Sequence, residues 1–307
     1  MAGHLWLLLG IGLFSSVEVA TKWVGRGIPP LWLAVVRFSL TGLLLLGPAW
    51  LALRRREERL SLRDVGRFIV LALIGVTLSI GLYHLAIPRM RANSAAILFS
   101  SNPAFVVLFS PWLLGERPGR RKIAGMLCGL AGVALFLSRP AAGLDTRSGI
   151  LMMTASLVLF ALYSVLAKRE MPRFGPLPIL SLAGLVGSIC MAPLAWCVEG
   201  PPGPALARVS WPGLAYLTLF ATAIAYVAYF SGLQRLGAAR GSFYFFLKPL
   251  LASLIAWLWL GERLTPQLAA GAAFVLAGLA LTLAPGTASL RQRASPTASA
   301  PASPTGS

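Results

Sequence analysis

The sequence predicts an all-α integral membrane protein with ten transmembrane helices, arranged as two inverted five-helix repeats. Three observations lead to this fold class. Hydrophobic residues make up 57% of the 307 residues and charged residues only 12%, a balance typical of chains that span lipid. Apolar runs of about twenty residues recur along the chain, and most charges lie between them or at their ends. Finally, a shift of 146 residues, the distance from position 102 to position 248, aligns the chain with itself.

The internal repeat rests on motifs that share this one shift without a net gap. Asn102-Pro103 falls on Lys248-Pro249, and Gly115-Glu116-Arg117 falls on Gly261-Glu262-Arg263. We therefore predict two repeat units, residues 1–138 and 139–284. Single residues follow the same shift, among them Phe14 and Phe160, Lys22 and Lys168, Tyr83 and Tyr229, Gly125 and Gly271, and Gly132 and Gly278.

The apolar runs give the expected helices in chain order. The first run has no basic segment before it and no obvious small-residue cleavage site after it, which favours a first membrane helix over a signal peptide. Because each unit has an odd number of helices, the second enters the membrane upside down relative to the first. Residues 285–307, rich in Ser, Thr, Pro and Ala, are expected to form a disordered cytoplasmic tail. The expected spans are 4–23, 30–53, 65–87, 92–114, 121–138, 149–167, 176–198, 211–233, 242–260 and 267–284.

Basic residues orient these spans. With the N-terminus in the cytoplasm, cytoplasmic segments hold sixteen Lys and Arg residues, and the opposite side holds eight. Cytoplasmic loops of membrane proteins carry such an excess. The distribution predicts a multi-pass protein of the plasma membrane, the bacterial inner membrane, with both termini cytoplasmic. The net charge of +18 is spread over many short loops, which indicates contact with anionic membrane lipids and argues against nucleic-acid binding.

Small residues and the few metal-ligating side chains suggest scaffold roles. Glycines in the fifth and tenth helices, such as Gly125 and Gly271, predict close helix packing, and a homodimer through these two helices is a second interpretation. The three cysteines all lie within spans and are expected to pack as small residues. The two histidines belong to no cluster with metal-ligand spacing, and no nucleophile elbow or phosphate loop is present. We therefore expect no metal, no cofactor and no catalytic residue.

Two long stretches carry a resemblance to a known family. The first unit contains LFSSVEVATKWVGRGIPPLWLAVVRF at 13–38 and LYHLAIPRMRANSAAILFSSNPAFVVLFSPWLLGERPGRRKIAGMLCGLAGVALF at 82–136. The second unit repeats the signature as GLQRLGAARGSFYFFLKPLLASLIAWLWLGERLTPQLAAGAAFVLAGLAL at 232–281. This pair of units resembles the EamA-type transporters of the drug/metabolite transporter superfamily, and the resemblance extends to about residue 284.

The resemblance implies a ten-helix carrier in which helices 3, 4, 8 and 9 enclose a central cavity. It also implies alternating access and a small organic substrate, often moved outward. Cargoes differ widely among similar proteins, so the resemblance does not name the substrate, the direction or the coupling ion. One departure is Glu18, at a position in the first helix where many relatives look apolar or aromatic.

Glu18 and Arg37 are ionisable residues within expected spans. Counted from the turn near Gly27, they lie nine and ten residues away, so a rise of ~1.5 Å per residue places them at nearly equal depth. We expect them to pair, because an unpaired charge in lipid is costly. Ser164 and Ala183 occupy the equivalent places in the second unit. The pair is either a gated or protonatable site that faces the cavity or a structural link between the first two helices.

The other candidate substrate-binding residues follow the repeat. Lys248 and Asn102 each precede a proline, which frees backbone carbonyls one turn earlier, and we expect both to face the cavity, although snorkelling of Lys248 to the interface competes. Tyr83 and Tyr229 form a symmetric aromatic pair that suits either a cavity lining or an interfacial belt. The remaining candidates are His84, which could titrate or simply be solvated, and Tyr244 and Phe245, which add aromatic surface or packing.

These features favour a secondary transporter that moves a small organic metabolite, with export the expected direction. An intramembrane enzyme or lipid-handling protein is the first alternative, but it would need a convergent catalytic constellation that the sequence lacks. A passive channel or a structural membrane subunit is the second alternative. Neither of these requires a duplicated unit, and duplication alone does not exclude them.

Overall fold

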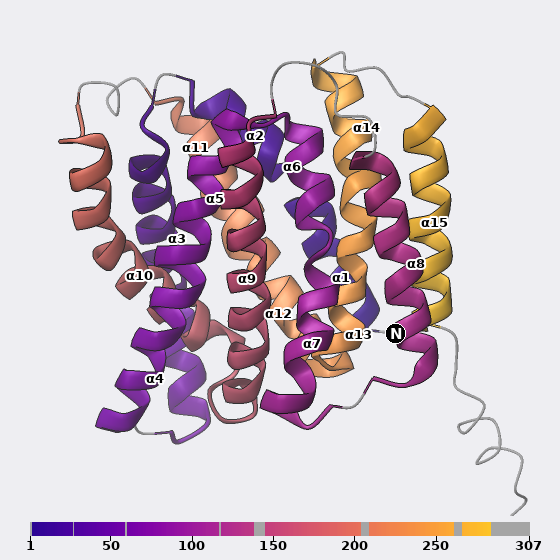
Figure 1. The fold of residues 1–307 in the computed structure, drawn as a ribbon. Coiled ribbons are helices and arrows are strands. Elements are labelled where there is room, and N and C mark those ends of the chain that lie inside the picture. The colour runs from indigo at the N-terminus through magenta and orange to yellow at the C-terminus, as the bar shows by residue number, and fades with distance from the viewer. Residues whose placement is uncertain are drawn as a thin grey trace, which may run out of the picture.

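The computed structural model describes residues 2–26, 28–58, 60–116, 118–137, 145–203, 209–260 and 266–283. Every regular element within these ranges is helical, and the helices stand side by side as a bundle (Figure 1). The expected cytoplasmic tail, 285–307, and the second Gly-Glu-Arg motif, 261–263, lie outside the described residues.

Within the first half of the chain, several expected spans consist of two or more consecutive helical elements. The first expected span is divided between α1 and α2, and the fourth between α6 and α7. The elements are α1 (Ala2–Phe14), α2 (Val17–Val24), α3 (Pro30–Arg55), α4 (Leu62–Ala72), η1 (Leu73–Ile80), α5 (Gly81–Ala86), η2 (Ile87–Arg89), α6 (Ala92–Phe99), α7 (Asn102–Leu114) and α8 (Arg120–Leu137).

The second half is built in a similar way. Its first helix runs well beyond the expected 149–167 and includes the charged residues at 168–170, which an α-helix accommodates once it leaves the lipid core. The elements are α9 (Arg147–Phe174), α10 (Pro176–Glu199), α11 (Trp211–Thr218), η4 (Leu219–Ile224), α12 (Ala225–Leu236), α13 (Ala238–Ser242), η5 (Phe243–Leu247), α14 (Lys248–Leu260) and α15 (Pro266–Leu283).

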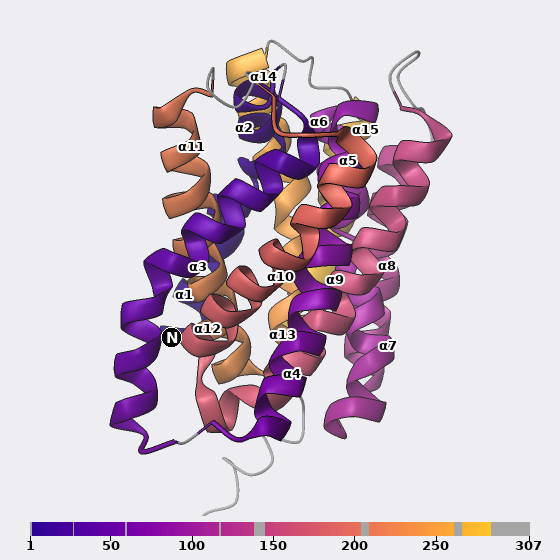
Figure 2. The same cartoon turned by 90° about the vertical axis from the view of Figure 1, so that its left-hand side faces the viewer.

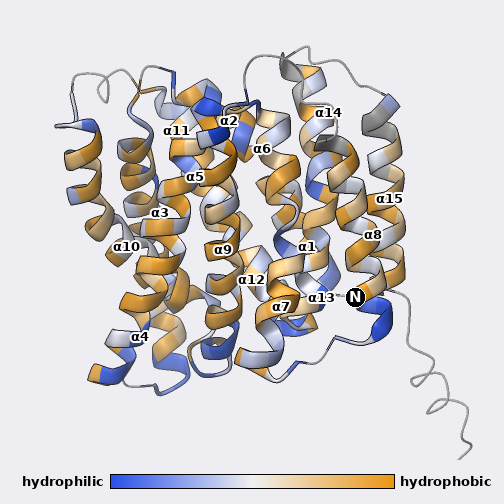
Figure 3. Cartoon of the chain, in the orientation of Figure 1, coloured by the Kyte–Doolittle hydropathy of each residue, from blue (hydrophilic) through white to orange (hydrophobic). Residues whose placement is uncertain are grey.

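Seven helical stretches of the described residues are long and apolar enough to cross a membrane. Figure 3 shows the corresponding pattern, because hydrophobic residues dominate the middle of the bundle and hydrophilic residues gather at its two ends. Large apolar side chains such as Leu43, Leu151 and Ile189 are exposed on the outer surface, as expected for residues that face lipid. The chain is therefore an all-helical, multi-pass membrane protein.

Departures from regular α-helix recur at matching positions. The π-helices η1 and η4 begin at Leu73 and Leu219, and the helices α7 and α14 begin at Asn102 and Lys248 after a local irregularity. Both distances are 146 residues, since 219 minus 73 and 248 minus 102 give the same number. The Pro residue after Asn102 or Lys248 occupies the first turn of its helix, where its missing N–H costs little.

One irregularity has no counterpart. The first span breaks between Phe14 and Val17, where Ser15 and Ser16 bond back to the carbonyls of Ile11 and Leu13. Such hydroxyl bonds compete with the helical ladder and bend helices. The equivalent stretch of α9 is continuous from Arg147 to Phe174. This break sets the orientation of α2, which carries Glu18 in its first turn.

Close helix contacts hold the bundle together. Helices α3 and α10 cross on one face of the molecule (Figure 2), and α8 and α15 lie together at the opposite edge of the view in Figure 1. A methyl group added at Gly125 would lie 2.6 Å from the Gly278 carbonyl, and one at Gly132 would lie 2.7 Å from the Gly271 carbonyl. These glycines thus pack α8 directly against α15 within one chain, so the homodimer through these helices stays a prediction without support from them.

Polar contacts join neighbouring segments at one end of the bundle. Arg173 pairs with Glu58 at 2.8 Å and with Asp64 at 2.6 Å. Glu116 accepts hydrogen bonds of 3.4 Å from the backbone N–H groups of Ala238 and Ala239 at the start of α13. The carboxylate of the first Gly-Glu-Arg motif thus has a structural contact, because it serves the exposed donors of a helix N-terminus.

Candidate functional site

Three charged side chains are buried in the middle of the bundle. Glu18 on α2 is 0% exposed, and Arg37 on α3 and Lys248 on α14 are each 2% exposed. Among the described residues, the other buried charged side chain is Asp64, which lies at the end of the bundle and pairs with Arg173. Charges inside a membrane protein are costly and mark functional sites by default, so these three define the candidate site.

Glu18 forms an ion pair with Lys248. The prediction that Glu18 pairs with Arg37 was wrong. The Lys248 ammonium donates to Glu18 Oε1, whereas Glu18 Oε2 has no hydrogen-bond partner among the described residues. The ammonium also lies 4.7 Å from the centre of the Phe99 ring and 5.8 Å from that of Tyr83. Counting residues along the two helices predicted that Glu18 and Arg37 lie at equal depth. It could not predict the direction in which α2 points the Glu18 carboxylate.

Arg37 is held by neutral oxygens. Its Nε donates to Thr222 Oγ1 at 2.5 Å, and its Nη2 donates to the Ala221 carbonyl at 3.3 Å. Both acceptors belong to the π-helix η4. Wide π-turns commonly occur at functional sites. The guanidinium therefore has hydrogen bonds but no ion pair with any carboxylate in the part of the chain that the structure describes.

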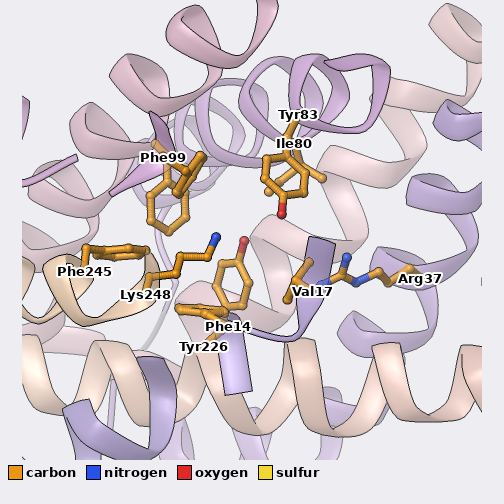
Figure 4. A pocket seen from close by; sticks show the side chains of 10 residues that line it. Phe14, Val17, Arg37, Ile80, Tyr83, Phe99, Tyr226, Phe245 and Lys248 are labelled. Atoms are coloured by element: carbon orange, nitrogen blue, oxygen red, sulfur yellow. The ribbon is translucent and has the colours of Figure 1, made fainter. Parts of the chain in front are cut away.

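A small cavity lies between these groups. Its volume is about 30 Å³, which is room for roughly one water molecule. Figure 4 shows the Lys248 ammonium and the hydroxyls of Tyr83 and Tyr226 directed into the same space, with Arg37 on the far side of Val17. We refer to this space as the central cavity, lined by Phe14, Val17, Arg37, Ile80, Tyr83, Phe99, Phe160, Tyr226, Phe245 and Lys248.

The lining combines symmetric apolar residues with asymmetric charges. Three pairs of lining residues are related by the 146-residue shift, namely Phe14 with Phe160, Ile80 with Tyr226, and Phe99 with Phe245. The charged residues break this pattern. The residues equivalent to Glu18, Arg37 and Lys248 are Ser164, Ala183 and Asn102, none of which carries a charge.

The aromatic rings of the lining touch one another. The ring of Phe14 meets that of Tyr226 edge-on at 4.9 Å between centroids, and the ring of Phe99 lies 5.4 Å from that of Phe160. Phe160 lies 6.0 Å from Tyr226. Edge-to-face contacts at these distances are favourable, so the aromatic residues form a continuous wall around the charged groups.

The structure places four predicted site residues on the central cavity, namely Arg37, Tyr83, Phe245 and Lys248. Glu18 is not part of the lining but pairs with Lys248. The buried position of Lys248 excludes snorkelling in this conformation. Helices 3, 4, 8 and 9 of the expected bundle contribute lining residues, as the family resemblance implied, and the first, second and sixth contribute Phe14, Val17, Arg37 and Phe160 as well.

Three predicted residues lie away from the cavity. Asn102 is buried and donates to the Leu157 carbonyl at 3.3 Å, so its expected position on the cavity was wrong. Tyr244 meets the His4 ring, with 2.5 Å between its hydroxyl and Nδ1. Tyr229 is fully buried behind the wall, where its ring packs against Phe245 at 5.1 Å.

His84 faces a second pocket. This pocket has a volume of about 510 Å³ and is lined also by Thr21, Lys22 and Trp23 near the end of α2. The imidazole is 0% exposed, and neither ring nitrogen has a hydrogen-bond partner among the described residues. His84 is therefore buried rather than solvated.

Sequence reasoning missed most of the aromatic lining. Phe99, Tyr226 and Ile80 were not singled out, although Phe99 and Ile80 are the repeat partners of Phe245 and Tyr226. The repeat shift applied to every candidate would have found Phe99 from Phe245, but neither Ile80 nor Tyr226, because neither of these was a candidate. The described residues include no group of three or more His, Cys, Asp or Glu side chains that could hold a metal ion.

Comparisons with known proteins agree with this architecture. The profile of the EamA-like transporter family matches residues 1–138 and 147–284. An uncharacterized transporter of Clostridium kluyveri is 24% identical over 90% of this chain and 91% of its own length. Another, from Archaeoglobus fulgidus, is 28% identical over 91% of this chain and 95% of its own length.

One solved crystal structure shares the fold. It aligns with a TM-score of 0.72 at 23% sequence identity, over 95% of this chain and 99% of that chain. At this identity the match supports the fold alone. The family profile covers nearly the whole chain in two consecutive matches, and the chain belongs to the EamA-like transporter family.

Proposed function

We propose that this protein is a secondary transporter that exports a small organic metabolite by alternating access. The observation that carries the proposal is the central cavity, which is small and is lined by buried side chains that include residue pairs from both halves of the chain. Carriers place the substrate site where two repeats meet and open it to either side in turn. A cavity of about 30 Å³ holds no organic molecule, so loading requires the helices around it to separate.

The two halves act in this proposal as inverted repeats of five transmembrane helices each, residues 1–138 and 139–284. The matched positions of η1 with η4, and of the helix starts at Asn102 and Lys248, support this arrangement. Irregular backbone at membrane depth is tolerated where it lines a cavity. It also gives the helices points at which they bend when the site changes its access.

The proposed orientation has both termini in the cytoplasm of a bacterium. The segments around Arg56, Arg120, Arg173 and Arg240 lie together at one end of the bundle, in agreement with their shared cytoplasmic assignment (Figure 1). The pocket beside His84 then lies on the opposite side, and it serves as the vestibule through which an exported molecule leaves.

Reporter fusions test this orientation. Because loop charges favour cytoplasmic termini, an alkaline phosphatase fused after Leu290 is expected to be inactive, and one fused at Gly203 is expected to be active. Fusion of green fluorescent protein at the same two positions gives the reciprocal control. Phosphatase activity after Leu290 together with none at Gly203 would reverse the orientation and remove the basis for export.

Counterflow in proteoliposomes tests the transport class. Vesicles loaded with an unlabelled metabolite extract are expected to accumulate the labelled substrate transiently, because a carrier exchanges bound molecules across the membrane. A passive channel gives no such overshoot, and an intramembrane enzyme or lipid-handling protein changes the compound or leaves it outside. Absence of exchange for every component of the extract would contradict the proposed function.

A further inference from the structure

The charges at the central cavity do not cancel. One carboxylate, Glu18, lies among two cations, Arg37 and Lys248, which leaves a surplus of one positive charge. All three side chains are almost completely buried. A buried cation is unfavourable unless a partner of opposite sign joins it, and here two cations share one carboxylate. The composition of the site therefore favours an anionic ligand that takes the place of the Glu18 charge.

Arg37 supplies the geometry for such a ligand. Its guanidinium lines the cavity, and its two hydrogen bonds run from Nε and Nη2 to neutral oxygens of η4. A guanidinium has five N–H donors and suits the two oxygens of a carboxylate or phosphate. The buried hydroxyl of Tyr83 adds a polar group without a partner among the described residues. The Arg37 guanidinium is held by its own hydrogen bonds before a ligand arrives.

Lys248 already holds an anion, which is the carboxylate of Glu18. An organic anion that reaches the cavity competes with this carboxylate for the ammonium. The rings of Phe14, Phe99, Phe160 and Phe245 surround the same space and favour an apolar or aromatic body on the ligand. The Glu18 side chain thus occupies the place of the ligand's charged group when the cavity is empty.

We propose that the central cavity binds an organic monoanion with an apolar or aromatic body, through Arg37 and Lys248, and that Glu18 leaves Lys248 and takes up a proton when the anion binds. The inference rests on the proposed transport function. The proton comes from water on the side to which the cavity is open and returns to water on the other side with the anion. One cycle therefore moves one anion and one proton together, with no net charge.

The surroundings of Glu18 permit this exchange. The charged and titratable groups that face it are Lys248 from α14, Arg37 from α3 and Tyr83 from α5. Other basic groups near α2 bond elsewhere, since the Lys22 ammonium donates to the Met90 carbonyl and Arg89 donates to the Leu85 carbonyl. Once Lys248 binds the ligand, the carboxylate of Glu18 lies beside a second anion, which favours its protonation.

Binding to the purified protein in detergent tests the ligand class without any transport assay. The probes are phenylacetate, phenylacetamide and phenethylamine, which share one ring and differ in charge. We expect phenylacetate to bind at least about tenfold more tightly than the other two, as judged by ligand-dependent thermal stabilisation. Equal binding of all three, no binding, or a preference for the amine would overturn the inference.

Variants of the ion pair separate binding from structure. Glu18→Gln removes the competitor, so phenylacetate affinity at neutral pH should rise about tenfold. In the double variant, Glu18→Gln ensures that Lys248→Met leaves no unpaired carboxylate behind. Because it lacks the ammonium, this variant should bind phenylacetate at least about tenfold more weakly than Glu18→Gln alone. A purely structural pair would give both variants the same affinity, which would overturn the proposal. Glu170→Gln, in the exposed pair with Arg67, is the matched control and should change nothing.

The pH dependence tests the proton. Because binding of the anion and of the proton favour each other, the apparent affinity of the unaltered protein should rise as pH falls, by about tenfold per pH unit at most. Glu18→Gln should show no such dependence between about pH 6 and pH 8, where phenylacetate stays ionised. Retained pH dependence in Glu18→Gln would overturn the role of Glu18. Counterflow of a cation or a neutral compound would instead preserve the proposed function and reject only the ligand class.

Discussion

Lys248→Ala is expected to destabilise the protein by about 3–5 kcal/mol, because it leaves the buried carboxylate of Glu18 without its partner. The loss exceeds that of an ordinary core truncation, since Glu18 is 0% exposed and its second oxygen already lacks a hydrogen bond among the described residues. The melting temperature and the yield of monodisperse protein in detergent measure the effect.

The rescue by a second change identifies the cause. Glu18→Gln combined with Lys248→Ala removes the unpaired charge and should recover most of the lost stability. Tyr244→Phe is the matched control on the preceding element, because it removes one hydrogen bond, to His4, and should cost only about 1 kcal/mol. A Lys248→Ala protein that melts like the unaltered one, or that Glu18→Gln fails to rescue, would show that the pair does not stabilise the bundle.

Gly10→Ala is expected to be the most disruptive single methyl addition on α1. The added Cβ would lie 2.8 Å from the backbone nitrogen of Tyr229 and 3.0 Å from the carbonyl oxygen of Ala225. Backbone atoms of α12 cannot rotate away as a flexible side chain does, so the two helices must separate. We expect a loss of about 1–3 kcal/mol and reduced exchange, because α12 also carries Tyr226 into the cavity.

Gly12 on the same helix provides the control. A methyl group added there meets no atom within 4 Å, and Ala is the better helix former, so Gly12→Ala should be neutral or stabilise the protein by up to about 1 kcal/mol. Melting curves of the two variants measure the difference. Equal melting temperatures would mean that α1 and α12 are not held in backbone contact.

The sequence correctly predicted an all-helical membrane protein, because the relevant signals are long, whereas the ten spans in two inverted repeats stay a prediction. Spans of about twenty apolar residues follow from the thickness of lipid and need no tertiary information. The prolines after Asn102 and Lys248 indicated a local break at matching positions, although each expected span was given as one continuous helix. The π-helices η1 and η4 have no comparable signal, so their contribution to the site was not foreseen.

The site was predicted only in part, because the depth of a residue in the membrane does not determine the direction of its side chain. The rise per residue placed Glu18 level with Arg37, but the break at Ser15 and Ser16 changes the direction in which α2 presents its first turn. Lys248 reaches Glu18 from a helix distant in sequence, and no local pattern connects the two. The Asn102 prediction was wrong for a related reason, since a repeat partner shares backbone position but not side-chain length or contacts.

The asymmetry of the charges gives the site a polarity that the surrounding scaffold lacks. In an inverted duplicate, exchanging each residue for its repeat partner amounts to turning the site over in the membrane. Suppose that positions 164, 183 and 102 carried the three charges and positions 18, 37 and 248 carried the neutral residues. The same binding groups would then face the opposite side of the membrane. In the proposed inverted-repeat arrangement, the residues that differ between the halves thus distinguish one side of the membrane from the other.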